Sequence, residues 1–120
     1  MTAAALAEII RSNRYRFADE YDLQDGIAGA LEAAGIEFER EVRVAGGRLD
    51  FLIEGVIDRV AIEVKITCPA AQVERQVRRY LEGGDVDGVV VVAMTPKHGA
   101  LPPEIAGKPV EVVVLAGAAL

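Results

Sequence analysis

Residues 36–66 contain three segments in which apolar and polar side chains alternate, and only short turns separate these segments. The segments are IEFEREVRV, RLDFLI and VAIEVKI, and the connections are AGG and EGVIDR. Strict alternation is typical of β-strands, and connections this short join antiparallel neighbours. The chain is therefore expected to build an antiparallel meander of three strands, and the other elements must pack around it.

Helical patterns flank the meander on both sides. The spacing of apolar residues predicts helices over residues 2–11, 18–34 and 70–82, with glycines just past the second and third. The β-branched run GVVVVAM predicts a strand buried on both faces, and VEVVVL predicts a last strand at the sheet edge. The third helix is long enough to cross over to a parallel strand. We therefore expect an α/β domain with a mixed sheet and helices on its faces.

Length, charge and composition narrow the class of protein. The 120 residues have the size of one domain, so we expect residues 1–120 to form a helical extension (1–17), a core (18–94), and a loop with a final strand (95–120). One cysteine excludes an internal disulfide and favours a reducing cytoplasm, and no apolar run is long enough to span a membrane. The net charge of −6 argues against a protein that coats nucleic acid through overall charge, but is compatible with an acidic metal site.

Two acids stand in segments that otherwise look like sheet core, Asp50 in the second strand and Glu63 in the third. If four residues form the loop between these strands, Asp50 falls directly opposite Glu63, with Cβ atoms about 5 Å apart. Lys65 is then on the same face as Glu63, roughly 6.6 Å further along the strand. Directly opposed like charges destabilise a sheet, and two carboxylates this close favour a divalent cation such as Mg²⁺ between them.

The first hairpin predicts the same polar face. A two-residue turn at Gly46–Gly47 would place apolar residues opposite one another on one face and set Arg43 beside Asp50 on the other. A metal there could activate water, and the Lys65 ammonium could hold a phosphate. Each acid taken alone is most simply a solvated side chain on an exposed strand face. The metal-site hypothesis therefore depends on the combined positions of Asp50, Glu63 and Lys65.

Asp50 followed by Glu63-Val64-Lys65 on the next strand resembles the PD-(D/E)XK nuclease superfamily, and the surrounding α-β-β-β-α-β order is similar to its restriction-endonuclease-like core. The resemblance covers residues 20–93 and looks closest to small Holliday-junction-resolvase-like nucleases of archaea, phages and mobile elements. It implies hydrolysis of DNA phosphodiester bonds with Mg²⁺, for which Mn²⁺ can substitute. Asp50, Glu63 and the main-chain carbonyl of Val64 would hold the metal, and Lys65 would assist the attacking water. Leu49 stands where the motif name has Pro.

Further site residues also follow from this resemblance. The family often has another acid in the helix before the meander; Gln24 occupies that position here and Glu20 lies one turn earlier, so the choice between them stays open. Gln76 and Tyr80 are similar to the Q-x-x-x-Y element of exonuclease-type members, which lies near the DNA backbone. A solvated helix face explains helical arginines equally well. The candidate contacts to DNA phosphates are Arg43, Arg75 and Arg79.

Two functions of different classes are therefore expected. One is a Mg²⁺-dependent deoxyribonuclease, of which a structure-specific, Holliday-junction-type endonuclease is one form. The other is a catalytically inactive nuclease-fold module for DNA binding or assembly. A chain this short offers a small DNA footprint, so we expect a homodimer that presents two sites. The sequence leaves open whether the substrate is a junction, an end, a nick or RNA. It also leaves open whether the chain acts as an endonuclease or an exonuclease.

Overall fold

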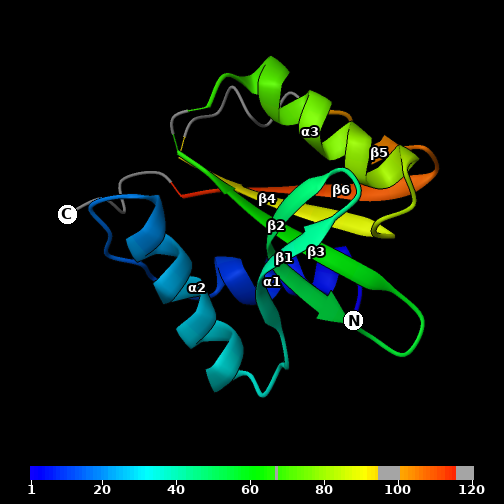
Figure 1. Cartoon of the computed structure of the whole chain (residues 1–120). Coiled ribbons are helices and arrows are strands. Elements are labelled where there is room, and N and C mark those ends of the chain that lie inside the picture. The colour runs from blue at the N-terminus through cyan, green and yellow to red at the C-terminus, as the bar shows by residue number, and fades with distance from the viewer. Residues whose placement is uncertain (67, 95–100, 116–120) are drawn as a thin grey trace.

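The computed structural model describes residues 1–66, 68–94 and 101–115. The elements are α1 (Ala3–Arg11), α2 (Glu20–Ala33), β1 (Glu39–Val44), β2 (Gly47–Glu54), β3 (Arg59–Lys65), α3 (Ala70–Glu82), β4 (Gly88–Ala93), β5 (Glu104–Ile105) and β6 (Lys108–Val114). The six strands among these residues form one sheet in the order β1-β2-β3-β4-β6-β5 (Figure 1). Strands β3, β4 and β6 are parallel, whereas β1, β2 and β5 run antiparallel to their neighbours. The prediction of an α/β fold with a mixed sheet flanked by helices is confirmed.

Local sequence signals set the ends of α2. The Asp19 side chain accepts a hydrogen bond from the Asp22 amide and caps the helix, so α2 begins later than the predicted residue 18. At the other end Gly35 adopts a φ of +72°, and the Ile36 amide donates to the Leu31 carbonyl. This is the Schellman arrangement that glycine favours, and it turns the chain into the meander.

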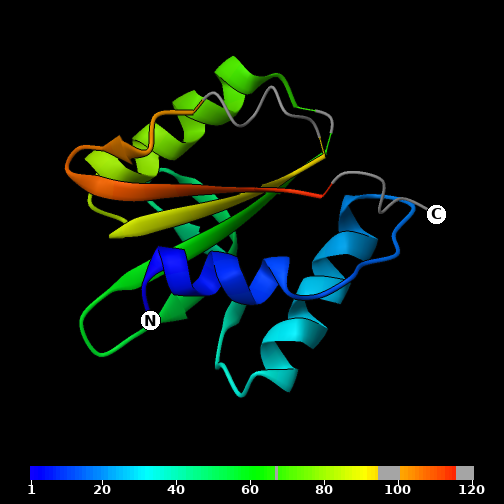
Figure 2. The same ribbon diagram turned by 180° about the vertical axis from the view of Figure 1, so that it is seen from behind.

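Helices cover both faces of the sheet. Helix α3 packs on one face, and α1 and α2 pack on the other (Figures 1 and 2). The β3 side chains alternate between the two cores: Val60, Ile62 and Val64 pack toward α1 and α2, whereas Ala61 packs toward α3. Glu63 shares the side of Ala61 because strand side chains alternate. The predicted polar face is therefore largely covered by α3, and Glu63 lies in the layer between the sheet and α3.

The β1–β2 hairpin has a different register from the predicted one. Its turn lies at Ala45–Gly46, Val44 pairs with Gly47, and Arg43 pairs with Arg48, so the predicted position of Arg43 beside Asp50 is wrong. Gly46 belongs to the turn and Gly47 to β2, and both glycines allow close packing against Tyr80. Gly47 has a φ of +143°, and a Cβ there would lie 3.2 Å from the hydroxyl oxygen of Tyr80 on α3.

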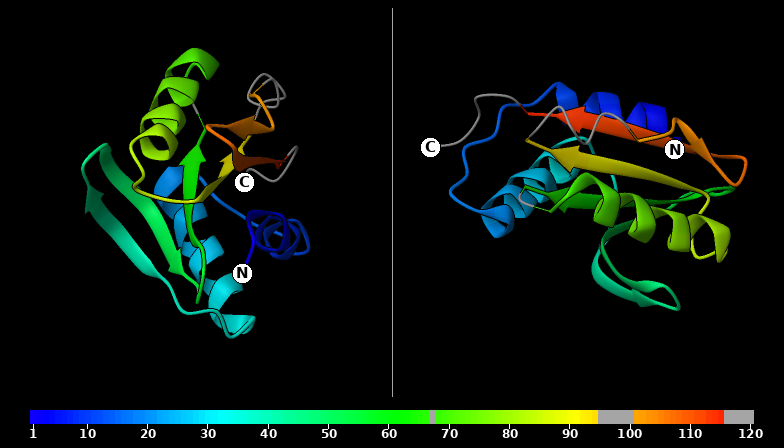
Figure 3. Two further views of the ribbon diagram at one scale, coloured as in Figure 1. Left: turned by 90° about the vertical axis from the view of Figure 1, so that its right-hand side faces the viewer. Right: turned by 90° about the horizontal axis from the view of Figure 1, so that it is seen from above.

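The same hairpin changes sides along its length. At its base Arg40 pairs with Phe51, which packs toward α2, whereas further along Val42 pairs with Leu49, which packs toward α3. Between these pairs Glu41 has a φ of +55°, a left-handed conformation that rotates the strand. The hairpin consequently projects from the edge of the sheet and its tip lies against α3 (Figure 3).

The C-terminal part differs from expectation in one strand. Strand β6 pairs with β4 on one side, but the two-residue β5 pairs with its start on the other, so β6 is not the edge strand that we predicted. A two-residue strand is too short to show a period in the sequence. Residues 95–100 of the expected loop and residues 116–120 of the expected tail lie outside the described residues. Among the described helices, none has the length and apolar character needed to cross a bilayer.

Candidate metal and phosphodiester site

The site begins where β2 and β3 stop pairing. The predicted register is confirmed from Glu54–Arg59 to Phe51–Ile62, where the backbone pairing ends. At the next position an Asp50 carboxylate oxygen accepts a hydrogen bond from the Val64 amide at 2.8 Å. The Asp50 side chain thus replaces a ladder bond and lies between the two separating strands.

Glu63 is the most unusual residue of the site. Its side chain is 1% exposed, and neither carboxylate oxygen has a hydrogen-bond partner among the described residues. The Lys65 ammonium lies 3.8 Å from Glu63 Oε2, and the Lys65 side chain is itself largely buried. A buried charge without close partners is costly, so this position requires either a proton or a cation.

Electrostatics around Glu63 agree with this geometry. Burial raises the pKa of Glu63 to about 9; the nearby Asp50 carboxylate raises it further, and the Lys65 ammonium partly opposes both effects. Without an added cation, Glu63 is therefore protonated at neutral pH. The single positive charge of Lys65 does not neutralise both Asp50 and an ionised Glu63.

Tyr80 and Gln76 link α3 to the hairpin beside this cluster. The buried Tyr80 hydroxyl donates to the Arg48 carbonyl at 3.0 Å, and Gln76 Nε2 donates to the same hydroxyl at 3.0 Å. Burial and the charge of Glu63 raise the pKa of Tyr80, so the hydroxyl remains a neutral donor. Gln76, a predicted site residue, therefore bonds Tyr80 and not the acids of the cluster.

The structure distinguishes the two candidates in the helix before the meander. Glu20 Oε1 accepts a hydrogen bond from the Ile66 amide at 2.8 Å, immediately after Lys65. Gln24 makes no side-chain hydrogen bond to β3 in the described part of the chain. Within that part, no three acidic, histidine or cysteine side chains gather closely enough to hold a metal ion. A metal would consequently depend on Asp50 and Glu63, completed by water or phosphate oxygens as Mg²⁺ usually is.

The predicted phosphate contacts on α3 are exposed and accessible. Arg78 is occupied by Glu74 at 3.1 Å and by Glu82 at 3.9 Å, whereas Arg75 and Arg79 form no ion pair with described residues. Arg75 and Arg79 also line a surface depression of about 440 Å³. Arg79 is close enough to Tyr80 to lower its pKa slightly. The exposed face of α3 therefore presents two guanidinium groups that have no ion-pair partner among the described residues.

The arginine that sequence reasoning missed is Arg48. It pairs with Arg43 at the exposed tip of the hairpin, and its carbonyl accepts the Tyr80 hydrogen bond. The missed signal was the glycine pair before it: glycines there permit close packing on a bulky partner as well as a turn.

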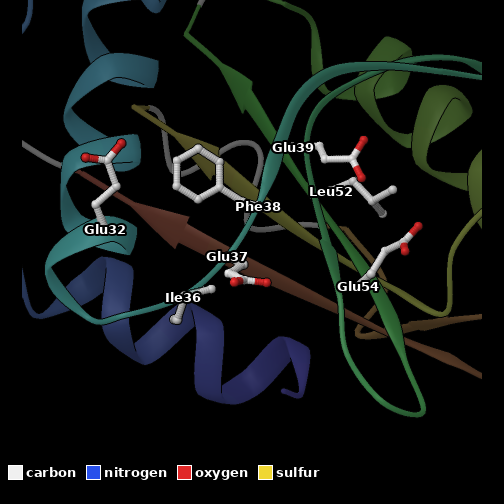
Figure 4. Close-up of a pocket in the computed structure, with 7 residues that line it drawn as sticks. All are labelled: Glu32, Ile36, Glu37, Phe38, Glu39, Leu52 and Glu54. Carbon is white, nitrogen blue, oxygen red and sulfur yellow. The ribbon is translucent and has the colours of Figure 1, made fainter.

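A separate hollow of about 640 Å³ lies between the end of α2, the segment that leads into β1, and β2 (Figure 4). Four of its seven lining residues are glutamates, and none of the predicted site residues is among them. An acidic lining repels phosphate, so this hollow is unsuited to a DNA backbone. The lining residues are Glu32, Ile36, Glu37, Phe38, Glu39, Leu52 and Glu54.

Comparisons with known proteins give a family and a distant structural likeness. No curated protein matches the sequence. SfsA from Pyrococcus furiosus, solved in complex with Ca²⁺, is similar to this chain with 19% identity and a TM-score of 0.46, over 78% of this chain and 56% of SfsA. The chain thus spans little more than half the length of SfsA. Residues 3–98 match the family described as "Domain of unknown function (DUF8371)", and the chain belongs to this family.

Proposed function

We propose that the chain is a divalent-metal-dependent nuclease of the PD-(D/E)XK type that hydrolyses DNA phosphodiester bonds. One observation carries the proposal: the buried Glu63 carboxylate has no hydrogen-bond partner among the described residues and lies beside both Asp50 and Lys65. Such a carboxylate needs either a proton or a compensating cation, and its hard oxygen donors suit Mg²⁺ or Mn²⁺. The position of Asp50 and Glu63 where β2 and β3 stop pairing, in a mixed sheet flanked by helices, supports the same assignment.

Each residue has a distinct role in this proposal. Asp50 and Glu63 would hold the metal together with the Val64 carbonyl, and a bound Mg²⁺ supplies charge stabilisation and an acidified water. The Val64 amide orients Asp50 through its hydrogen bond. The Lys65 ammonium, which lies 3.8 Å from Glu63 Oε2, would bind the scissile phosphate and stabilise its developing charge. Glu20 holds the end of β3 through the Ile66 amide, which fixes the backbone on which Lys65 stands.

A second candidate function is a nuclease-fold module that binds DNA without cutting it. Two observations favour it: Asp50 already bonds the Val64 amide, and both oxygens of Glu63 are covered. Catalysis requires that this covered carboxylate reach a metal ion, whereas simple binding does not.

Cleavage assays separate the two functions. Plasmid, linear and four-way-junction DNA should be cut with Mg²⁺ or Mn²⁺ and not with EDTA. Asp50→Asn and Lys65→Met should each lower the rate about 10²-fold or more, as loss of a preorganised electrostatic group does. Glu54→Gln is the matched control, because Glu54 is an exposed acid at the far end of β2.

The outcomes are decisive for the assignment. Full activity in Asp50→Asn or Lys65→Met would discard this site. A wild-type chain that binds DNA equally with and without metal, yet never cuts it, would establish the second candidate.

The proposed nuclease would act as a homodimer. One chain carries one cluster, so two chains are needed to cut both strands at one place. Sedimentation velocity over a concentration series should show a two-chain species, and a monomer at every concentration would contradict this part of the proposal.

A further inference from the structure

The tip of the β1–β2 hairpin carries two arginines that oppose each other directly. Arg43 and Arg48 are register partners, so their Cβ atoms lie about 5 Å apart. Both are exposed, and neither forms an ion pair or a side-chain hydrogen bond with a described residue. Directly opposed like charges destabilise a sheet. This arrangement therefore costs free energy as it stands.

The chain has acids available to neutralise arginines and uses them elsewhere. Its net charge is −6, with 19 acidic residues against 13 basic ones. Four arginines have acidic partners within 4 Å, whereas the hairpin pair, like Arg75 and Arg79 on α3, has none among the described residues. The paired arginines are Arg11, Arg40, Arg59 and Arg78. A missing partner for the hairpin arginines is consistent with an anion that comes from outside the chain.

The hairpin tip is held firmly, so the two arginines are presented on a fixed backbone. The Arg48 carbonyl accepts the buried Tyr80 hydroxyl, and the Gly46 amide donates to Asp85 Oδ2 at 3.0 Å. Val42 and Leu49, which alternate with the arginines, pack toward α3. Arg43 and Arg48 consequently point away from α3. A fixed backbone lowers the entropy lost when a ligand binds.

We infer that Arg43 and Arg48 form a clamp for one phosphate of the DNA backbone, on the face of the hairpin that points away from α3. The substrate named here rests on the proposed function. Guanidinium groups match phosphate oxygens in a bidentate manner, and an anion between two of them removes their repulsion. Arg48 and Asp50 are two residues apart on one strand, a separation of about 7 Å. The clamp binds any sequence, because the phosphate backbone carries no base identity.

DNA binding without cleavage tests the clamp. Fluorescence anisotropy of a labelled duplex is measured in EDTA over a series of salt concentrations. Arg43→Gln and Arg48→Gln should each weaken binding about tenfold, the loss expected for one charge-assisted hydrogen bond. Each should also reduce the slope of log K against log salt by about 1. Neither should lower the Tm of the free protein, because each relieves repulsion.

Arg59→Gln is the matched control. It removes one positive charge at the start of β3, the opposite end from Lys65, where Arg59 pairs with an acid at 3.6 Å. Its binding should stay within about twofold of the wild type, because overall charge acts weakly at a distance in salt. If both hairpin variants bind as Arg59→Gln does, or if the wild type does not bind DNA, the clamp is refuted.

The clamp and the proposed nuclease fail in different ways. Arginine-dependent binding without any metal-dependent cleavage would refute the nuclease and support the clamp. Metal-dependent cleavage with unchanged binding in both hairpin variants would support the nuclease and refute the clamp.

Discussion

Replacing Glu63 by glutamine should change how the stability of the chain depends on pH. In the folded chain, burial raises the pKa of Glu63 from 4.5 to about 9. Between these values folding takes up a proton, because the unfolded chain has released it and the folded chain retains it. The stabilisation from the protonated side chain is complete below about pH 4.5 and is lost as the pH rises toward 9.

The expected size of the effect follows from the same shift. Each pKa unit corresponds to about 1.4 kcal/mol, so the wild type should lose about 4 kcal/mol of unfolding free energy between pH 5 and 8. Glu63→Gln has no proton to take up at this position. The unfolding free energy of Glu63→Gln minus that of the wild type should therefore increase by about 4 kcal/mol from pH 5 to pH 8.

Urea unfolding at pH 5, 6, 7 and 8 in EDTA measures this difference. Glu54→Gln is the control, since the Glu54 side chain is 57% exposed and its variant should keep the wild-type pH dependence. Parallel stability curves for Glu63→Gln and the wild type would refute the reasoning, because they would mean that Glu63 is already ionised in the folded chain.

Three further predictions concern metal, hydrogen bonding and backbone strain. Mg²⁺ at about 100 times its Kd should raise the wild-type unfolding free energy by about 2.7 kcal/mol and leave Glu63→Gln unchanged, as measured by urea titration. Tyr80→Phe should cost about 1–2 kcal/mol in the same assay, because the Arg48 carbonyl loses its donor; an unchanged midpoint would show that the bond contributes nothing. Gly47→Ala should cost at least about 1 kcal/mol, because a Cβ at φ +143° meets the Tyr80 hydroxyl at 3.2 Å, and a Tm equal to that of the wild type would contradict the close packing described here.

Sequence reasoning succeeded where local signals were unambiguous. Helix α3 spans residues 70–82 as predicted, because Pro69 precedes it and Gly83 follows it. The β2–β3 register also follows from the sequence, since a turn that starts at Gly55 leaves only one pairing that keeps apolar residues together. That register was sufficient to place Asp50 and Glu63 at neighbouring positions.

The remaining features depend on contacts between segments far apart in the chain. The turn at Ala45–Gly46 was missed because two adjacent glycines satisfy either a turn or a close approach to Tyr80, and only the position of α3 decides between them. The left-handed Glu41 is likewise invisible in an alternating pattern. Alternation gave the side of the sheet on which Glu63 lies, but the helix that buries it follows from packing alone.

The parting of β2 and β3 means that no ladder hydrogen bonds fix the gap between Asp50 and Glu63. Asp50 belongs to a hairpin anchored on α3, whereas Glu63 belongs to a strand flanked by β4 and tied at its end to α2. The gap between the two acids is therefore set by the hydrogen bond from the Val64 amide to Asp50 and by the packing of α3 on the hairpin.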